Sequence, residues 1–404
     1  MRRIWPHAHQ RRQITSSRIG ALLMNPSNSQ INAFREQILN AGKNKTSLSI
    51  EGGGTKSWYG NVNKYSKLDT RPYSGILEYQ PEELVITACA GTPLKEIEAA
   101  LQEKNQVLAF EPPHFGENAT FGGAIAAGLA GPGRITVGNF RDFVLGTRIL
   151  DGKGQDLSFG GKVMKNVAGY DVSRLLPGSL GTLALLLEAS VKVLPKPAAS
   201  ATLRCHVSQA KALKILNEWA GQPLPLSASC WVGKVKDGDG ELTIRLAGAS
   251  AAVKAAIPLM SASVDARELD PVQAETFWND VREQKLSVFT NLAENQTLYR
   301  LALPAACGSL DIPKTSEDLV LEWHGQQRWV QADGDDATFS TLKILAHAHG
   351  GHATRFRQGS NVNPSAQRFT LLSENTHTKA LEIVQERLRS AFDPAGVFAT
   401  KRLP

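Results

Sequence analysis

The sequence lacks any long uninterrupted apolar segment, and its few cysteines are scattered. No stretch of its 404 residues approaches about 18 consecutive apolar residues, so the sequence predicts no transmembrane helix. The four cysteines, Cys89, Cys205, Cys230 and Cys307, form no Cys-x-x-Cys pair. This spacing excludes a zinc ribbon and an iron–sulfur cluster held by this chain alone, and it is typical of buried thiols in a reducing compartment.

Acidic residues are missing from the first 24 residues, which hold five arginines. Without these five positive charges the formal net charge of +7 falls to +2, which predicts no nucleic-acid surface on the rest of the chain. An acid-free, arginine-rich start resembles a transit peptide. Alternatively, and in our preferred interpretation, Met24 is the true start. Residues 1–27 are therefore expected to be a disordered or over-predicted N-terminus.

The remaining composition is ordinary, with 42% hydrophobic and 21% charged residues. These fractions exclude a disordered chain, a collagen and a coiled coil, and the length predicts roughly two to three domains. Apolar spacing predicts a helix from about residue 28 and a final helix from Lys379 to Phe392. Apolar runs predict strands at 48–50, 84–90, 144–150, 157–159, 183–194, 242–246 and 298–303, with Asp151-Gly152 as a hairpin turn.

Glycine is concentrated in three clusters. The first is Gly52-Gly53-Gly54-Thr55-Lys56-Ser57, the second runs from Thr120 to Gly128, and the third covers 160–171 and 178–183. The first matches neither a Walker A loop nor a Rossmann fingerprint, because Thr55 and Ser57 stand where those motifs need glycine. Consecutive glycines nevertheless allow main-chain N–H groups to converge on an anion. A bare loop, a tight helix crossing and ordinary turns are the alternative interpretations of the three clusters.

The order and spacing of these clusters predict that three loops converge on one long anion-binding groove. The informative segments are EGGGTKSWYG, YQPEELVITACAGTPLKEIEAAL, FEPPHFGENATFGGAIAAGLAGPGR, GNFRDFVLGTRILDGKGQDLSFGGKVMKNVAGYDVSRLLPGSLGTL and the closing FDPAGVF. Together they resemble the vanillyl-alcohol-oxidase-type (PCMH-type) flavoproteins and, more closely, the FAD-binding E subunits of bacterial glycolate oxidase, also called glycolate dehydrogenase. The resemblance covers about residues 30–404 and is strong through residue 197. Ala399-Thr400-Lys401-Arg402 departs from the Asn-Pro-Gly-Arg that is more frequent in the family.

The resemblance implies an α+β fold with three parts. A two-subdomain PCMH-type FAD-binding domain would span 28–198, a shortened α+β cap domain 199–345, and a C-terminal segment, 346–404, would return to the first domain. FAD would be bound non-covalently, because no histidine lies in residues 51–60, and His114 is the nearest candidate for a covalent link. The implied FAD contacts are Gly52, Gly53, Gly54 and Thr55 at the pyrophosphate, Thr120, Gly122, Gly123 and Gly138 beneath the diphosphate and isoalloxazine, Pro112 at the ring, Gly181 and Thr182 near the adenosine, and Asp142 as a structural or ribose-side contact.

Oxidation of a 2-hydroxy acid requires a cation for the carboxylate and a base for the hydroxyl proton. The candidates are Arg300, Arg328, Arg355, Arg357, His347, His349 and His352. Of these, Arg300, Arg328 and His352 are retained as weak catalytic candidates, with salt-bridged arginines and ordinary histidines as the alternative. Gly350 and Gly351 interrupt any helix between the histidines, so the sequence predicts no metal site.

The resemblance implies a FAD-binding subunit of a complex that oxidises glycolate to glyoxylate. Because the chain has no cysteine cluster, electrons would pass to a separate iron–sulfur subunit, beside a companion FAD-binding D subunit. The expected location is cytoplasmic, peripheral at the inner face of the cytoplasmic membrane, with membrane contact only through partners and no nucleic acid bound. The alternatives are a stand-alone FAD oxidoreductase for another hydroxy acid and a non-catalytic assembly subunit that holds FAD.

Overall fold

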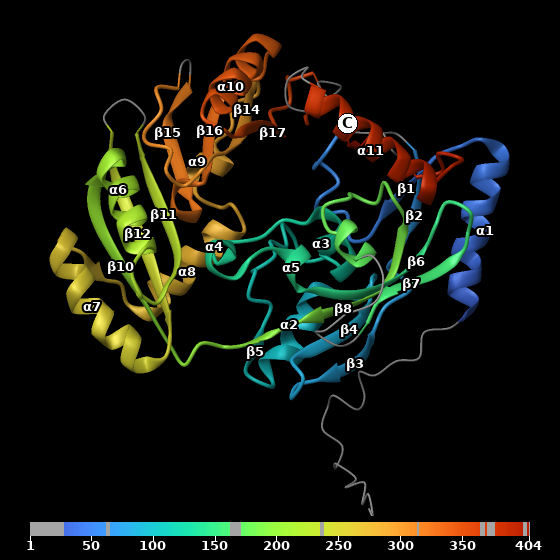
Figure 1. Ribbon diagram of the computed structural model, residues 1–404, viewed down its shortest axis with the longest axis horizontal. Coiled ribbons are helices and arrows are strands. Elements are labelled where there is room, and N and C mark those ends of the chain that lie inside the picture. The colour runs from blue at the N-terminus through green and yellow to red at the C-terminus, as the bar shows by residue number, and fades with distance from the viewer. Residues whose placement is uncertain are drawn as a thin grey trace, which may run out of the picture.

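The computed structural model describes residues 28–61, 65–161, 171–234, 238–312, 315–363, 368–369, 376–398 and 402–403. Two lobes, each built on its own β-sheet, lie side by side (Figure 1). The mixture of helices and strands confirms the predicted α+β class. The N-terminal stretch 1–27 and residues 162–170 of the third glycine cluster lie outside the described residues.

The first lobe contains a five-stranded sheet in the order β3-β4-β8-β6-β7, and all of its neighbouring strands are antiparallel. Its strands are β3 (Ile76–Gln80), β4 (Val85–Cys89), β6 (Val144–Leu150), β7 (Asp156–Gly160) and β8 (Leu185–Lys192). The predicted hairpin is confirmed, because β6 and β7 pair across Asp151-Gly152. β8 is buried along almost its whole length because both faces of the sheet are covered.

Two cores flank this sheet. On one face, Leu186 and Ala189 pack with α2 (Leu94–Gln102) and α3 (Phe121–Ala127). On the other face, Leu185 and Leu187 pack with α1 (Asn28–Asn44) and with the small parallel sheet of β1 (Leu48–Glu51) and β2 (Ser66–Asp69). Leu185, Leu186 and Leu187 thus alternate between the two cores, as the alternation of side chains along a strand requires, and a register shift in the pairing with β6 then brings Ala189 to the same core as Leu186.

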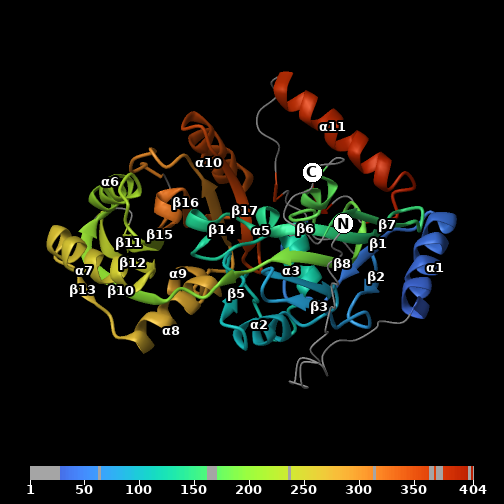
Figure 2. The same cartoon turned by 60° about the horizontal axis from the view of Figure 1, so that its bottom comes forward.

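The C-terminal end of the chain completes the first lobe. Phe398 is fully buried and forms a parallel bridge to Leu48, whose amide donates to the carbonyl of Val397 at 2.6 Å. Both amides at 397 and 398 donate to Asp393, at 2.8 Å each. The preceding helix α11 (Thr376–Phe392) lies above this lobe with its end near β7 (Figure 2), where Phe392 meets Phe159.

The second lobe is an eight-stranded antiparallel sheet in the order β13-β10-β12-β11-β15-β16-β14-β17. Its strands are β10 (Ala199–Ser208), β11 (Leu226–Lys234), β12 (Asp239–Gly248), β13 (Arg267–Glu268), β14 (Gln296–Ala302), β15 (Thr315–Glu322), β16 (Gln327–Asp333) and β17 (His352–Gln358). The boundaries proposed at 198 and 345 remain predictions. The chain passes between the sheets just before β10, and β17 still belongs to the second sheet.

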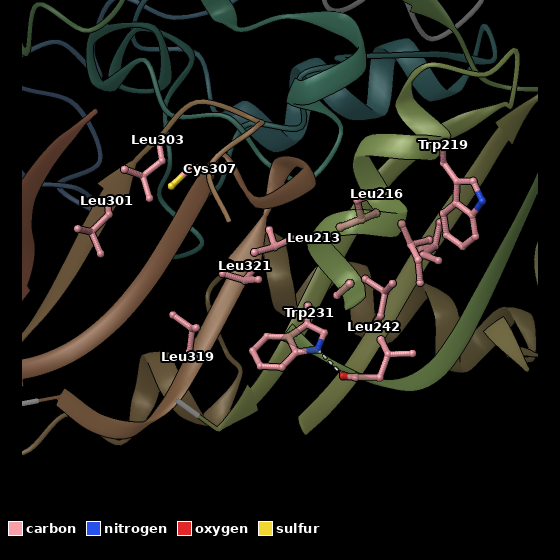
Figure 3. Close-up of a cluster of buried hydrophobic side chains, with 14 of the residues drawn as sticks. Leu213, Leu216, Trp219, Trp231, Leu242, Leu301, Leu303, Cys307, Leu319 and Leu321 are labelled. Atoms are coloured by element: carbon pink, nitrogen blue, oxygen red, sulfur yellow. Dashed lines mark hydrogen bonds between the residues drawn. The ribbon is translucent and has the colours of Figure 1, made fainter. Parts of the chain in front are cut away.

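One face of the second sheet is covered by three helices, α6 (Gln209–Ala220), α7 (Ser250–Val264) and α10 (Asp336–Ala348). Apolar side chains of these helices and of the sheet form a single core (Figure 3). Trp231 lies inside it, and its indole N–H donates to the carbonyl of Val207 at 3.0 Å, so the one polar atom of this buried ring is satisfied.

The other face of the second sheet is turned toward the first lobe. Cys230, Val320 and Trp329 on this face belong to the same cluster as Tyr59 and Ala127 of the first lobe. The helices α8 (Pro271–Arg282) and α9 (Ser287–Thr290) complete this cluster. Apolar burial therefore joins the two lobes and positions the sheet opposite the glycine-rich loops.

The short elements are β5 (Gln106–Val107), which pairs with β9 (Leu194–Pro195), α4 (Arg134–Val137), α5 (Phe140–Phe143) and the 3-10 turns η2 (Val172–Leu175) and η3 (Trp323–Gly325). Within the described ranges, none of the helices combines the length and the apolar character that a membrane crossing requires.

Candidate functional site

The first glycine cluster forms a loop that leaves β1 and lies directly against the chain before α3. A Cβ added to Gly53 would stand 1.5 Å from the carbonyl oxygen of Asn118, and one added to Gly52 would stand 2.2 Å from Oγ1 of Thr120. Glycine is therefore required at position 53, where two backbones touch, and at position 52 a side chain would displace the side chain of Thr120.

Within the described residues, the amides of this loop belong to neither a helix nor a strand. In the described part of the chain, none of the amides of Gly52, Gly53, Gly54 and Thr55 donates a hydrogen bond. Gly54 is left-handed, with φ of +73°, and the four residues are half-buried. Partly buried N–H groups need an acceptor, so consecutive free amides at a left-handed turn make a cradle for an anion.

The second and third glycine clusters meet the first. The Thr120 side chain caps α3 by accepting from the amide of Gly123 at 3.2 Å, and Gly122 packs against Ala90. Gly181 is left-handed and lies against Ile50. Of the expected FAD contacts, one pocket is lined by Gly52, Gly53, Gly54, Thr55, Thr120, Gly122, Gly123 and Gly181.

Four other expected contacts are not among the residues lining this pocket: Pro112, Gly138, Asp142 and Thr182. Asp142 instead accepts from the amide of Asn139 at 2.8 Å and caps the short helix α5. Thr182 donates its hydroxyl to the carbonyl of Ser179 at 2.7 Å and is buried. Their polar groups therefore serve the local backbone.

Two cationic side chains of the pocket were not identified from the sequence. Lys56 is only 9% exposed, and its Nζ donates to the carbonyl of His114 at 3.0 Å. Burial lowers the pKa of Lys56 to about 8, although the nearby Glu283 opposes this effect. Arg402 holds the loop by donating to the carbonyls of Tyr59 and Lys56, at 3.1 Å each.

A second cavity, of about 590 Å³, lies between the two lobes. Ala127 and Leu180 line both this cavity and the glycine pocket, so the two spaces are adjacent. A single elongated ligand with an anionic middle could therefore extend from the glycine loops to the second sheet. We call this second cavity the interlobe cavity.

Two arginines from different lobes line the interlobe cavity. Arg300 on β14 donates to the hydroxyl of Tyr59 at 3.5 Å, and Arg134 at the start of α4 lies 4.4 Å from the ring centroid of Trp323. Burial and the positive charge of Arg300 lower the pKa of Arg134. Neither guanidinium forms an ion pair with a carboxylate anywhere in the described ranges, so the cavity can hold an anion. The sequence predicted Arg300 but not Arg134.

The other two catalytic candidates, His352 and Arg328, lie on opposite faces of the second sheet. His352 lines the cavity, where burial and the charge of Arg300 lower its pKa. Arg328 is fully buried on the opposite face of the sheet, and its guanidinium donates to the carbonyls of Gly325, Gly308 and Cys307 at 3.1, 2.7 and 2.6 Å. These three hydrogen bonds give Arg328 a structural role, and Arg328 is not among the residues that line the cavity.

The remaining candidates, Arg355, Arg357, His347 and His349, are not among the residues that line the interlobe cavity. Arg355 pairs with Asp336 at 2.7 Å, and Arg357 donates to the Gln284 side chain at 3.1 Å. His349 contacts the carbonyl of Leu345 at 3.0 Å. No cluster of three or more histidine, cysteine or acidic side chains suited to a metal ion occurs in the described residues.

The comparisons with known proteins agree with this geometry. Residues 30–160 match the family model of the FAD binding domain. The chain is 43% identical over 371 residues to the glycolate oxidase subunit GlcE of Escherichia coli, covering 92% of this chain and 96% of that protein. It is 37% identical over 128 residues to the glycolate oxidase subunit GlcD of Bacillus subtilis, covering 32% of this chain and 27% of that protein.

The fold is also found among solved structures. An alkyldihydroxyacetonephosphate synthase superposes with a TM-score of 0.64 at 15% identity, over 93% of this chain and 75% of that one. At this identity the likeness concerns the fold alone. Together with the long match to GlcE, it confirms the resemblance seen in the glycine clusters. The chain belongs to the family of FAD-dependent oxidoreductases that includes the glycolate oxidase subunit GlcE.

Proposed function

We propose that this chain is the FAD-binding subunit of a glycolate dehydrogenase complex and that it oxidises glycolate, or a closely related 2-hydroxy acid, in the interlobe cavity. The observation that carries the proposal is the pair Arg300 and Arg134, two unpaired guanidinium groups from different lobes lining one cavity beside the glycine pocket. A carboxylate accepts hydrogen bonds from such groups in a defined orientation.

The glycine pocket fits FAD. The free amides of Gly52, Gly53, Gly54 and Thr55 would bind the pyrophosphate, and Lys56 would balance its charge. When bound, FAD supplies a hydride acceptor for the carbon-bound hydrogen of the substrate. Binding is proposed to be non-covalent, because the loop holds no histidine and His114 lines neither the glycine pocket nor the interlobe cavity.

The protein's own residues have two tasks in this reaction. Arg300 and Arg134 would hold the substrate carboxylate and thereby fix which hydrogen points toward the cofactor. The apolar cluster that joins the lobes, including Trp329 and Phe356, would keep bulk water out of the cavity. Orientation and exclusion of water are both needed before hydride transfer can compete with side reactions.

The partners follow from the relatives' names and from the cysteines. The relatives GlcE and GlcD are named as subunits of glycolate oxidase, so we propose a complex containing a companion D subunit. All four cysteines are buried and far apart, so electrons would leave through a separate iron–sulfur subunit. The complex would lie in the cytoplasm at the inner face of the membrane.

Anaerobic titration of the purified chain with glycolate tests this proposal. We expect a yellow protein whose FAD is released by acid and whose visible flavin absorbance is bleached by glycolate. The same titration with glyoxylate, the product, is the control and should leave the flavin oxidised. If the complex turns over while the flavin of the isolated chain stays oxidised, catalysis belongs to another subunit and this chain serves assembly.

A further inference from the structure

Glu322 is a buried carboxyl group in the wall of the interlobe cavity. It ends β15, is 4% exposed and forms no ion pair within the described ranges. Two neutral donors from β16 hold it, the indole N–H of Trp329 and the side-chain amide of Gln327, the latter at 3.0 Å. Both donate to Oε2. In the described structure Oε1 accepts no hydrogen bond and is left for another partner.

The turn that follows Glu322 is strained and is held against the first lobe. Trp323, His324 and Gly325 have φ values of +52°, +57° and +84°, so two large side chains adopt a conformation that favours glycine. The Trp323 indole donates to the carbonyl of Gly131 at 3.0 Å, and the His324 amide donates to Oγ of Ser229 at 3.0 Å. Such strain persists only where the surroundings impose it, and it is frequent at functional sites.

The electrostatic surroundings of Glu322 suit a group that exchanges a proton near neutral pH. Burial raises its pKa to about 7, and the hydrogen bonds from Trp329 and Gln327 limit the rise. On β11 the opposite residue is Cys230, a thiol whose own pKa is raised by burial. The other charged or titratable groups lining the cavity are Tyr59, Arg134, Arg141, Arg282, Arg300 and His352.

We propose that Glu322 accepts the hydroxyl proton of the substrate during 2-hydroxy-acid oxidation. The proposal rests on the proposed function. The O–H bond of the substrate breaks and its proton passes to a carboxylate oxygen of Glu322. The carbon-bound hydrogen would leave with its electron pair, for which FAD, when bound, would supply the two-electron acceptor. The C–O single bond of the substrate would thereby become a carbonyl.

The first test is the pH dependence of flavin reduction by glycolate in the E322Q variant. Glutamine has the same shape and still accepts the indole N–H, but it takes up no proton. In the wild type, the rate should rise with pH through about 7, because only the ionised carboxylate is a base. In E322Q the rate should be about 10²- to 10⁴-fold lower and should lose this rise. The matched control is E241Q, the same change at an exposed position of β12, which should keep the wild-type profile.

The second test needs no turnover. Calorimetry of oxalate binding in two buffers of different ionisation enthalpy measures proton uptake. A bound anion next to Glu322 should draw a fraction of a proton into the wild type near pH 7, and E322Q should take up none. Should E322Q fail to fold, W329F replaces it, because loss of one donor should move both the rate profile and the uptake to higher pH.

The two proposals fail in different ways. If 2-hydroxy acids reduce the wild-type flavin and E322Q is reduced at the same rate with the same pH profile, the role of Glu322 is refuted and the proposed function stands. If 2-hydroxy acids leave the wild-type flavin oxidised, the proposed function fails. In that case equal proton uptake in wild type and E322Q refutes the proton-accepting role as well.

Discussion

Replacing Gly53 with alanine should yield a protein that is purified without FAD. The new Cβ would stand 1.5 Å from the carbonyl oxygen and 2.4 Å from the carbonyl carbon of Asn118. Both are backbone atoms, so no side-chain rotation relieves the clash and the loop itself must move. Overpacking of about 1–3 kcal/mol or more corresponds to a loss of about 10- to 100-fold or more in FAD affinity.

The first measurement is the ratio of flavin to protein after purification, with FAD released by acid and quantified. The second is the temperature of unfolding of the same sample. Gly308 provides the matched control, because an added Cβ there meets nothing within 4 Å and its φ is ordinary. G308A should retain the wild-type flavin content. A yellow G53A protein with the wild-type FAD content would show that the binding of FAD does not depend on this loop.

Replacing Arg300 with alanine should nearly abolish reduction of the flavin by glycolate while leaving FAD bound. Arg300 belongs to β14 of the second lobe, away from the glycine loops, but it lines the interlobe cavity together with Arg134. Removing the guanidinium that would pair with the buried substrate carboxylate should cost about 2–5 kcal/mol of transition-state stabilisation, which is about 30- to several-thousand-fold in kcat/KM. R300K should recover only part of this loss, because lysine cannot donate two parallel hydrogen bonds.

The measurement is the anaerobic rate of flavin bleaching as a function of glycolate concentration. R267A is the matched control, since Arg267 is exposed on β13 at the far edge of the same sheet. It should behave like the wild type. Equal rates in R300A and wild type would place the substrate carboxylate elsewhere, while loss of FAD from R300A would indicate a structural role instead.

The glycine loops could be predicted because a run of consecutive glycines is visible in the sequence itself. The left-handed backbone of Gly54 is a local requirement, whereas glycine is needed at position 53 because the distant backbone of Asn118 lies against it, and that contact could not be predicted from the sequence. The hairpin at Asp151-Gly152 was likewise predictable, since its turn chemistry is contained in a few residues. Sequence patterns of this kind can be interpreted without knowledge of long-range contacts.

The choice among arginines could not be made in this way. In the pairing of β14 with β16, Arg300 lies opposite Trp329 and Leu301 lies opposite Arg328. Paired residues share a face, so Arg300 faces the first lobe whereas Arg328 faces the core under the helices. A shift of one residue would exchange them, and only the pairing of distant strands sets that register.

Arg134 and Glu322 were missed for a related reason. Arg134 closes the segment FEPPHFGENATFGGAIAAGLAGPGR, which attracted attention for its glycines, and Glu322 lies far along the chain at the end of β15. Both residues line one cavity only because the second sheet packs against the first lobe. Trp323 shows the contact directly, since its ring lies over Arg134 and its N–H binds the carbonyl of Gly131. Functional residues that come together across the interface between the two lobes show no characteristic spacing in either segment of the sequence.

The closure of the first lobe by the end of the chain has a consequence for biosynthesis. Leu48 pairs with Phe398, and Arg402 binds carbonyls of the loop that begins at Gly52. A ribosome must therefore translate the entire second lobe before the N-terminal lobe can finish folding. We expect the nascent polypeptide to remain colourless and to acquire its flavin only after release.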